Sequence, residues 1–84
     1  MYIVTGSMTT AERLRRAAES ATGYPAYTVR TPAKIRKGGC SYSVKMDDRA
    51  LEPVRKVIRD YGFGVKKIYK VRTRNGESVY HAVS

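Results

Sequence analysis

Cys40, the only cysteine of this 84-residue chain, is the side chain best suited to chemistry. The ten residues before it carry four cations and end in two glycines: Arg30, Lys34, Arg36, Lys37, Gly38 and Gly39. Nearby positive charge favours the thiolate over the thiol, and the thiolate is the nucleophilic form of cysteine. A single cysteine cannot form an internal disulfide, so this pattern indicates a reactive thiol.

Packing is the alternative interpretation of Cys40. Segment 40–46 alternates in polarity, with Cys40, Tyr42, Val44 and Met46 on one face and Ser41, Ser43 and Lys45 on the other. This period of two is typical of a half-buried strand whose first face meets the core. Free cysteine often behaves as a small buried hydrophobe. The sequence leaves both interpretations open.

Other catalytic and metal-binding patterns are missing from the sequence. One cysteine and one histidine, His81, cannot supply a structural zinc site. Gly62-Phe63-Gly64 is a lone G-x-G without the rest of a dinucleotide fingerprint. We therefore expect no metal, no cofactor and no enzymatic activity.

The composition predicts one small domain, residues 1–84, with an anionic partner. Seventeen Lys and Arg against seven Asp and Glu give a net charge of +10. Such a charge attracts nucleic acid, acidic proteins, anionic lipid or small anions. The sequence shows neither a signal-peptide pattern nor an apolar run of membrane-spanning length. We expect a cytoplasmic protein that does not enter the membrane.

The elements that must position Cys40 follow from periodicity and breaker residues. Thr9 and Glu12 form a T-x-x-E capping pattern that marks a helix start, and Gly23 ends that helix. A second helix starts near Asp47, Asp48 or Glu52 and ends at Gly62, and Asn75-Gly76 predicts a hairpin turn. The predicted strands are 2–5, 24–30, 40–46, 65–72 and 78–83.

This order predicts an α+β fold of the ferredoxin-like βαββαβ type. Its antiparallel sheet would carry two helices on one face and an extra C-terminal hairpin strand. In that topology the end of strand 2–5, the first helix N-terminus, the 31–39 loop and Cys40 share one end of the sheet. A helix N-terminus favours anions. The candidate anion- or partner-binding residues beside Cys40 are Arg30, Lys34, Arg36, Lys37, Gly38, Gly39, Thr9 and Thr10.

A basic nucleic-acid-binding or ribosome-associated module without thiol chemistry is the alternative function. Segment 66–74 is a second basic stretch, and several tyrosines offer faces on which bases could stack: Tyr2, Tyr27, Tyr42, Tyr69 and Tyr80. No RNP-type run accompanies them, and tyrosines often serve packing instead. The edge of strand 78–83 also offers a homodimer contact.

The chain resembles the Se/S carrier protein-like family of small bacterial proteins. The resemblance covers residues 1 to about 71 and rests on segment 2–5, on Thr31-Pro32 followed by Ile35 and Cys40, and on segment 62–69. Family members often have glycine directly after the cysteine, whereas here Ser41 follows Cys40. The resemblance implies that Cys40 accepts sulfur or selenium as a persulfide-type adduct. It also implies donor and acceptor proteins as partners.

Overall fold

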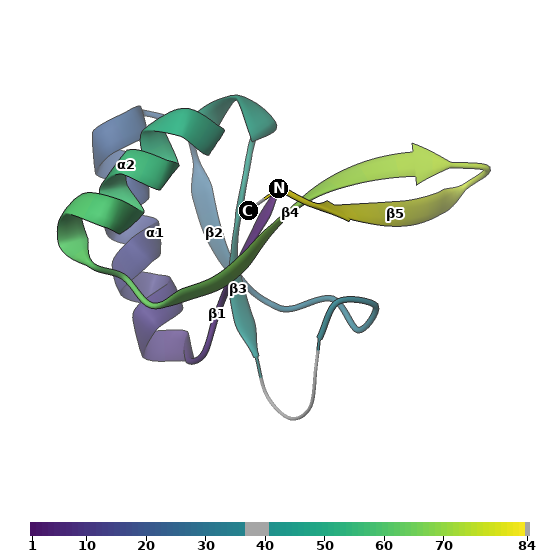
Figure 1. Cartoon of the computed structure of the whole chain (residues 1–84), viewed down its shortest axis with the longest axis horizontal. Coiled ribbons are helices and arrows are strands. Elements are labelled where there is room, and N and C mark those ends of the chain that lie inside the picture. The colour runs from purple at the N-terminus through teal and green to yellow at the C-terminus, as the bar shows by residue number, and fades with distance from the viewer. Residues whose placement is uncertain (37–40, 84) are drawn as a thin grey trace.

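The computed structural model describes residues 1–36 and 41–83, which form five strands and two α-helices (Figure 1). The elements in chain order are β1 (Tyr2–Thr5), α1 (Met8–Thr22), β2 (Ala26–Arg30), β3 (Tyr42–Met46), a 3-10 turn (Asp48–Ala50), α2 (Leu51–Tyr61), β4 (Val65–Arg74) and β5 (Glu77–Ala82). Each predicted element is present, with ends shifted by a few residues.

The strands form one antiparallel sheet in the order β2-β3-β1-β4-β5. Both helices lie on the same side of it (Figure 1). The predicted α+β class, with an antiparallel sheet and two helices, is confirmed. With five strands in this order, the sheet does not match the ferredoxin-like order in full. The fifth strand is the predicted C-terminal hairpin strand: β4 runs past the helix layer and pairs along its far half with β5.

The core lies between the helices and the sheet. Ile3 of β1 faces Val44 on one neighbouring strand and Ile68 on the other, and all three side chains are buried. On α1 the buried side chains are Ala11, Leu14 and Ala18, and on α2 they are Val54 and Val57. The alanines keep α1 close to the sheet, and removal of this apolar surface from water is the main stabilising contribution.

The first helix starts earlier than the capping pattern predicted. Ser7 is the N-cap, and its Oγ accepts the Thr10 backbone N–H at 3.1 Å. The expected Thr9–Glu12 capping box is therefore wrong. Glu12 instead accepts hydrogen bonds from Arg15 and from the Thr28 hydroxyl on β2. Glu12 therefore bonds to a residue three positions farther along α1 and to the neighbouring strand, and does not close the start of the helix.

The β4–β5 hairpin closes through Asn75 and Gly76, as the sequence predicted. Both residues have positive φ, 52° and 78°, and Arg74 pairs directly with Glu77. A two-residue turn with two left-handed residues matches the twist of the strands that it joins. The hairpin projects from the rest of the sheet on the side away from the helices (Figure 1).

Candidate functional site

A cluster of hydroxyl groups lies where β2 ends and β3 begins. Thr31 Oγ1 is 2.8 Å from Ser41 Oγ and 2.7 Å from Ser43 Oγ, so the Thr31 hydroxyl bridges the two serines. The Thr31 backbone N–H also donates to the Ser41 carbonyl oxygen at 3.0 Å. Thr31 is 2% exposed and Ser43 0%. Buried polar groups of this kind are held by mutual hydrogen bonds. We call Thr31, Ser41 and Ser43 the hydroxyl cluster.

The hydroxyl cluster adjoins the end of β1 and the start of α1. Ser41 Oγ lies 3.5 Å from the carbonyl oxygen of Thr5, the last residue of β1. The buried Thr5 hydroxyl in turn donates at 3.0 Å toward the carbonyl oxygens of Ser7 and Tyr42. The chain leaving β1, the cap of α1 and the start of β3 are thus fastened together. The predicted convergence of these segments is present in the described residues.

Burial of Ser43 corrects one prediction about β3. Ser43 lies on the face away from the helices, which the alternating pattern predicted to be solvated, yet its side chain is fully buried. Its neighbour Val4 on β1, on the same face, is only 6% exposed. Because Thr31 begins the segment after β2 and bonds to Ser43, we attribute this burial to that segment folding back over the sheet. Lys45, farther along the same face, is exposed as expected.

Four of the predicted site residues lie outside the described part of the chain. They are Lys37, Gly38, Gly39 and Cys40. Their predicted roles stay predictions. The described residues that flank them are fixed: the Arg36 N–H donates to the Pro32 carbonyl oxygen at 3.0 Å, and Ser41 belongs to the hydroxyl cluster.

The remaining predicted site residues occupy three places. Thr9 is exposed on the first turn of α1, and Thr10 is bonded to Ser7 through both its N–H and its hydroxyl. Arg30 is the last residue of β2 and pairs with Tyr42 in the sheet register. Lys34, by contrast, is turned toward the β4–β5 hairpin. Its Nζ donates to the Ser78 carbonyl oxygen at 3.1 Å. Lys34 thus contacts the hairpin, and its predicted role beside Cys40 stays a prediction because Cys40 lies outside the described residues.

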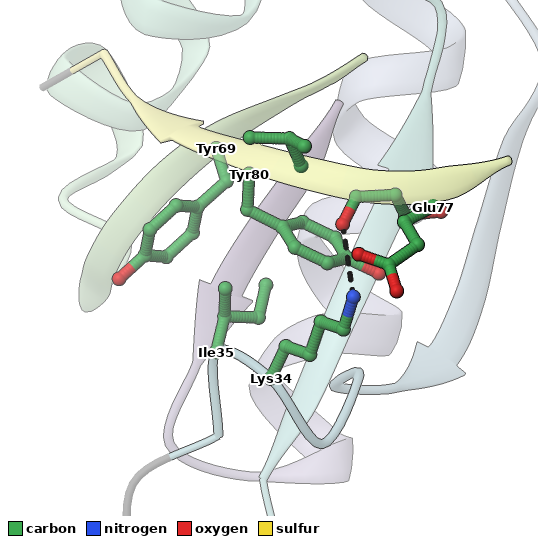
Figure 2. A pocket seen from close by; sticks show the side chains of 7 residues that line it. Lys34, Ile35, Tyr69, Glu77 and Tyr80 are labelled. Carbon is green, nitrogen blue, oxygen red and sulfur yellow. Dashed lines mark hydrogen bonds between the residues drawn. The ribbon is translucent and has the colours of Figure 1, made fainter. Parts of the chain in front are cut away.

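Between the segment that carries Lys34 and the hairpin there is a hollow of about 460 Å³. Figure 2 shows the rings of Tyr69 and Tyr80 extending from the strands toward Ile35 and Lys34, with Glu77 at one side. Glu77, Ser78 and Val79 complete its lining. Sequence reasoning treated Lys34 as a partner of Cys40 and missed this hollow, since nothing in the local pattern shows that the hairpin reaches the 31–36 segment.

The strongest local electrostatic effects lie on the helix side of the molecule. Hydrogen bonds from Arg15, and then from Thr28, lower the pKa of Glu12 to about 2. Hydrogen bonds from the Arg49 side chain and backbone likewise lower the pKa of Asp47 to about 2. Both carboxylates are therefore ionised at neutral pH. Neither carboxylate is a proton donor at that pH. Glu12 instead connects α1 to β2 through its hydrogen bond from Thr28.

Two further findings concern metals and membranes. No group of three or more His, Cys, Asp and Glu side chains in residues 1–36 and 41–83 is arranged to hold a metal ion. Neither helix in those ranges has the length and apolar character needed to cross a membrane.

Comparison with known proteins identifies the family. Residues 1–70 match the family described as "Putative Se/S carrier protein-like", which is most of the chain. The chain belongs to this family, and the resemblance drawn from Thr31-Pro32 and Cys40 is confirmed. No curated protein and no solved structure matches the chain.

Proposed function

We propose that this protein is a carrier that takes up sulfur or selenium on Cys40 and hands it to an acceptor. The observation that carries the proposal is membership of a family named for Se/S carriage in a chain with one cysteine. The protein would be a carrier and not an enzyme. It would act in the cytoplasm, where thiols stay reduced.

The proposed transfer is a thiol–persulfide exchange. The Cys40 thiolate attacks the terminal sulfur of a donor persulfide, R–S–SH. A bond forms between the Cys40 sulfur and that terminal sulfur, and the donor S–S bond breaks. The bonding pair leaves with the donor as a thiolate, R–S⁻, and Cys40 carries –S–SH. An acceptor thiolate repeats the exchange, so no external oxidant or reductant is consumed. A selenium donor would follow the same sequence.

The surroundings of segment 37–40 support this proposal. Ser41, which follows Cys40 along the chain, is held by the hydroxyl cluster beside the capped start of α1. Hydroxyl groups and a helix N-terminus favour an anion such as a thiolate or persulfide. Arg36 lies four residues before Cys40 in the sequence. Its backbone is anchored to Pro32, and its side chain offers a cation.

A loading experiment tests the proposal. The full chain would be incubated under anaerobic conditions with a cysteine desulfurase and cysteine, and its intact mass recorded. We expect a gain of one sulfur atom on the wild type, removed by dithiothreitol, and none on Cys40→Ser. Failure of the wild type to gain sulfur from the desulfurase and from a small-molecule persulfide would reject the carrier function.

The thiol pKa gives a second test. The rate of Cys40 alkylation as a function of pH should have its midpoint below about 8.5, the ordinary value for cysteine. Arg36→Gln should raise that midpoint by removing a nearby cation. Arg59→Gln on α2 makes the same change of charge at an exposed position and should leave it unchanged. Equal midpoints in both variants would show that Arg36 does not act on the thiol.

A further inference from the structure

The face of the sheet away from the helices carries a row of tyrosines. The register pairs Tyr27 with Lys45, Lys45 with Tyr2, and Tyr2 with Tyr69, so these four residues lie side by side across β2, β3, β1 and β4. Directly opposite residues of antiparallel strands share a face. We call this row, together with Tyr80 of β5, the tyrosine face.

The tyrosines of this face range from partly to largely exposed. Tyr27 is 60% exposed, and Tyr2, Tyr69 and Tyr80 are half-buried. The Tyr2 and Tyr80 rings contact each other at a centroid distance of 5.9 Å, and Lys45 Nζ lies 5.9 Å from the Tyr2 centroid. Tyr42 differs, because it packs against the core from the helix side. The prediction that Tyr42 could offer a stacking surface is therefore wrong, whereas the other four tyrosines share one face.

The hollow beside the hairpin continues the tyrosine face. Tyr69 and Tyr80 form part of its lining, and Lys34 and Ile35 close the opposite side (Figure 2). A volume of about 460 Å³ is within the range of small-molecule sites, roughly 300–1,000 Å³. The hollow therefore has room for a nucleobase-sized group against an aromatic wall.

The charge of this region suits a polyanion. Lys45 and Lys67 lie on the same face as the tyrosines, and Lys34 stands beside the hollow. None of the strand residues that the register places on this face is acidic, within the strands the structure describes. Glu77 lines the hollow but belongs to the other face of the hairpin by its pairing with Arg74. The chain as a whole carries a net charge of +10.

We propose that the tyrosine face binds single-stranded nucleic acid. Unpaired bases would stack on Tyr27, on the contacting rings of Tyr2 and Tyr80 and on Tyr69, and Lys34, Lys45 and Lys67 would neutralise phosphates. Aromatic rings interleaved with cations on an open sheet are the recurrent means of binding single strands without sequence preference. A duplex keeps its bases stacked internally and cannot use the rings. This activity is separate from the Cys40 chemistry.

Fluorescence anisotropy with labelled oligonucleotides tests this proposal. The probes are oligo-U RNA, oligo-dT DNA and a duplex of equal length, each titrated with the full chain at low and moderate salt. We expect both single strands to bind at least about tenfold more tightly than the duplex. Tyr27→Ala should weaken single-strand binding about 5- to 150-fold, the range for loss of one stacked base. Tyr27→Phe keeps the ring and should bind as the wild type does.

Matched variants distinguish binding by the tyrosine face from non-specific binding caused by the positive charge of the chain. Tyr61→Ala removes an even more exposed tyrosine, 70% exposed, on α2 and should leave binding unchanged. Lys45→Ala should reduce the salt dependence by about one phosphate contact, whereas Lys56→Ala on α2 should not. Cys40→Ser should bind normally, so this test and the sulfur-loading test can fail independently. Equal binding by Tyr27→Ala and wild type, or equal binding of duplex and single strand, would overturn the proposal.

Discussion

The two faces of the sheet are held by different physical forces. The helix-covered face is apolar, with Ile3, Val44 and Ile68 buried under α1 and α2. On the opposite face, burial at Ser43 and Thr31 rests on hydrogen bonds between hydroxyl groups. That face also buries Val4, and farther along its strands it presents tyrosines and lysines. One sheet therefore supports a packed side and a side available for contacts.

The difference shows that in a chain of 84 residues one face of the sheet can provide most of the stability while the other positions a connecting segment. Apolar burial is non-directional and scales with area, so two helices are needed to cover one face. The hydroxyl cluster buries little area, but each hydrogen bond is directional and fixes where the segment after β2 sits. The free energy of unfolding should therefore depend most on the helix-covered face. The position of the segment after β2 should depend on the opposite face.

The largest expected effect comes from emptying the core under the helices. Ile3→Ala should lower the free energy of unfolding by about 2–5 kcal/mol, because it removes buried methyl groups and leaves a cavity. Met8→Ala removes a side chain that is 57% exposed and should change stability by less than about 0.5 kcal/mol. Urea denaturation of both variants measures the difference. Comparable losses would show that the helix-covered face is not the dominant core.

The next effect concerns the hydroxyl cluster. Thr31→Val keeps the shape but removes the hydroxyl that bridges Ser41 and Ser43, leaving the buried Ser43 Oγ without this partner. We expect a loss of about 1–3 kcal/mol in unfolding free energy. The same substitution at the exposed Thr73 should be nearly neutral. An equal response at both positions would mean that the hydroxyl cluster does not fix the segment after β2.

Acid should lower the free energy of unfolding by a smaller amount, because it protonates the Glu12 and Asp47 carboxylates. The folded pKa of Glu12 is lowered from 4.5 to about 2, so its contribution is complete above pH 4.5 and is lost as the pH falls toward 2. Asp47, lowered from 3.8 to about 2, acts in the same direction. Denaturation midpoints measured from pH 6 to pH 3 should fall less steeply for Glu12→Gln than for wild type. Glu77→Gln, on the hairpin, is the matched control. If Glu12→Gln and wild type fall alike, the Glu12 contacts do not contribute.

The smallest effect on stability is expected on the tyrosine face. Tyr27→Ala should change the free energy of unfolding by less than about 0.5 kcal/mol, because the ring is 60% exposed. The same variant is the one predicted to weaken single-strand nucleic-acid binding. Thermal denaturation beside the anisotropy titration measures both properties. A large loss of stability in Tyr27→Ala would show that the tyrosine face also contributes to the stability of the fold, contrary to the contrast drawn with the helix-covered face.

Much of the fold could be predicted from the sequence because its signals are local. The alternation in 40–46 predicted which side of β3 meets the core, and Asn75-Gly76 predicted the hairpin turn. The helix start failed at Thr9 because Ser7 offers an equally good hydroxyl two residues earlier. Local patterns name several candidate caps, and packing of the following turn selects among them.

The candidate site was less predictable. Ser41 and Ser43 were assigned to a solvated face, since their alternation with apolar residues describes only one strand. The burial of Ser43 and the partial burial of Ser41 depend on Thr31, ten or more residues earlier, and on the path of the chain between them. The bond from Lys34 to Ser78 was not predicted either, because it joins residues 44 positions apart in the chain.

The sequence by itself determined the single cysteine, the basic charge, the order of helices and strands and the family, because these depend on residue identity and short-range periodicity. Only the tertiary structure decided that the hydroxyls of Thr31 and Ser43 are buried, that Tyr2, Tyr27, Tyr69 and Tyr80 share a face while Tyr42 does not, and that Lys34 meets the hairpin. Strand register and the path of the segment after β2 set those contacts, and both arise from pairings between residues far apart in the chain.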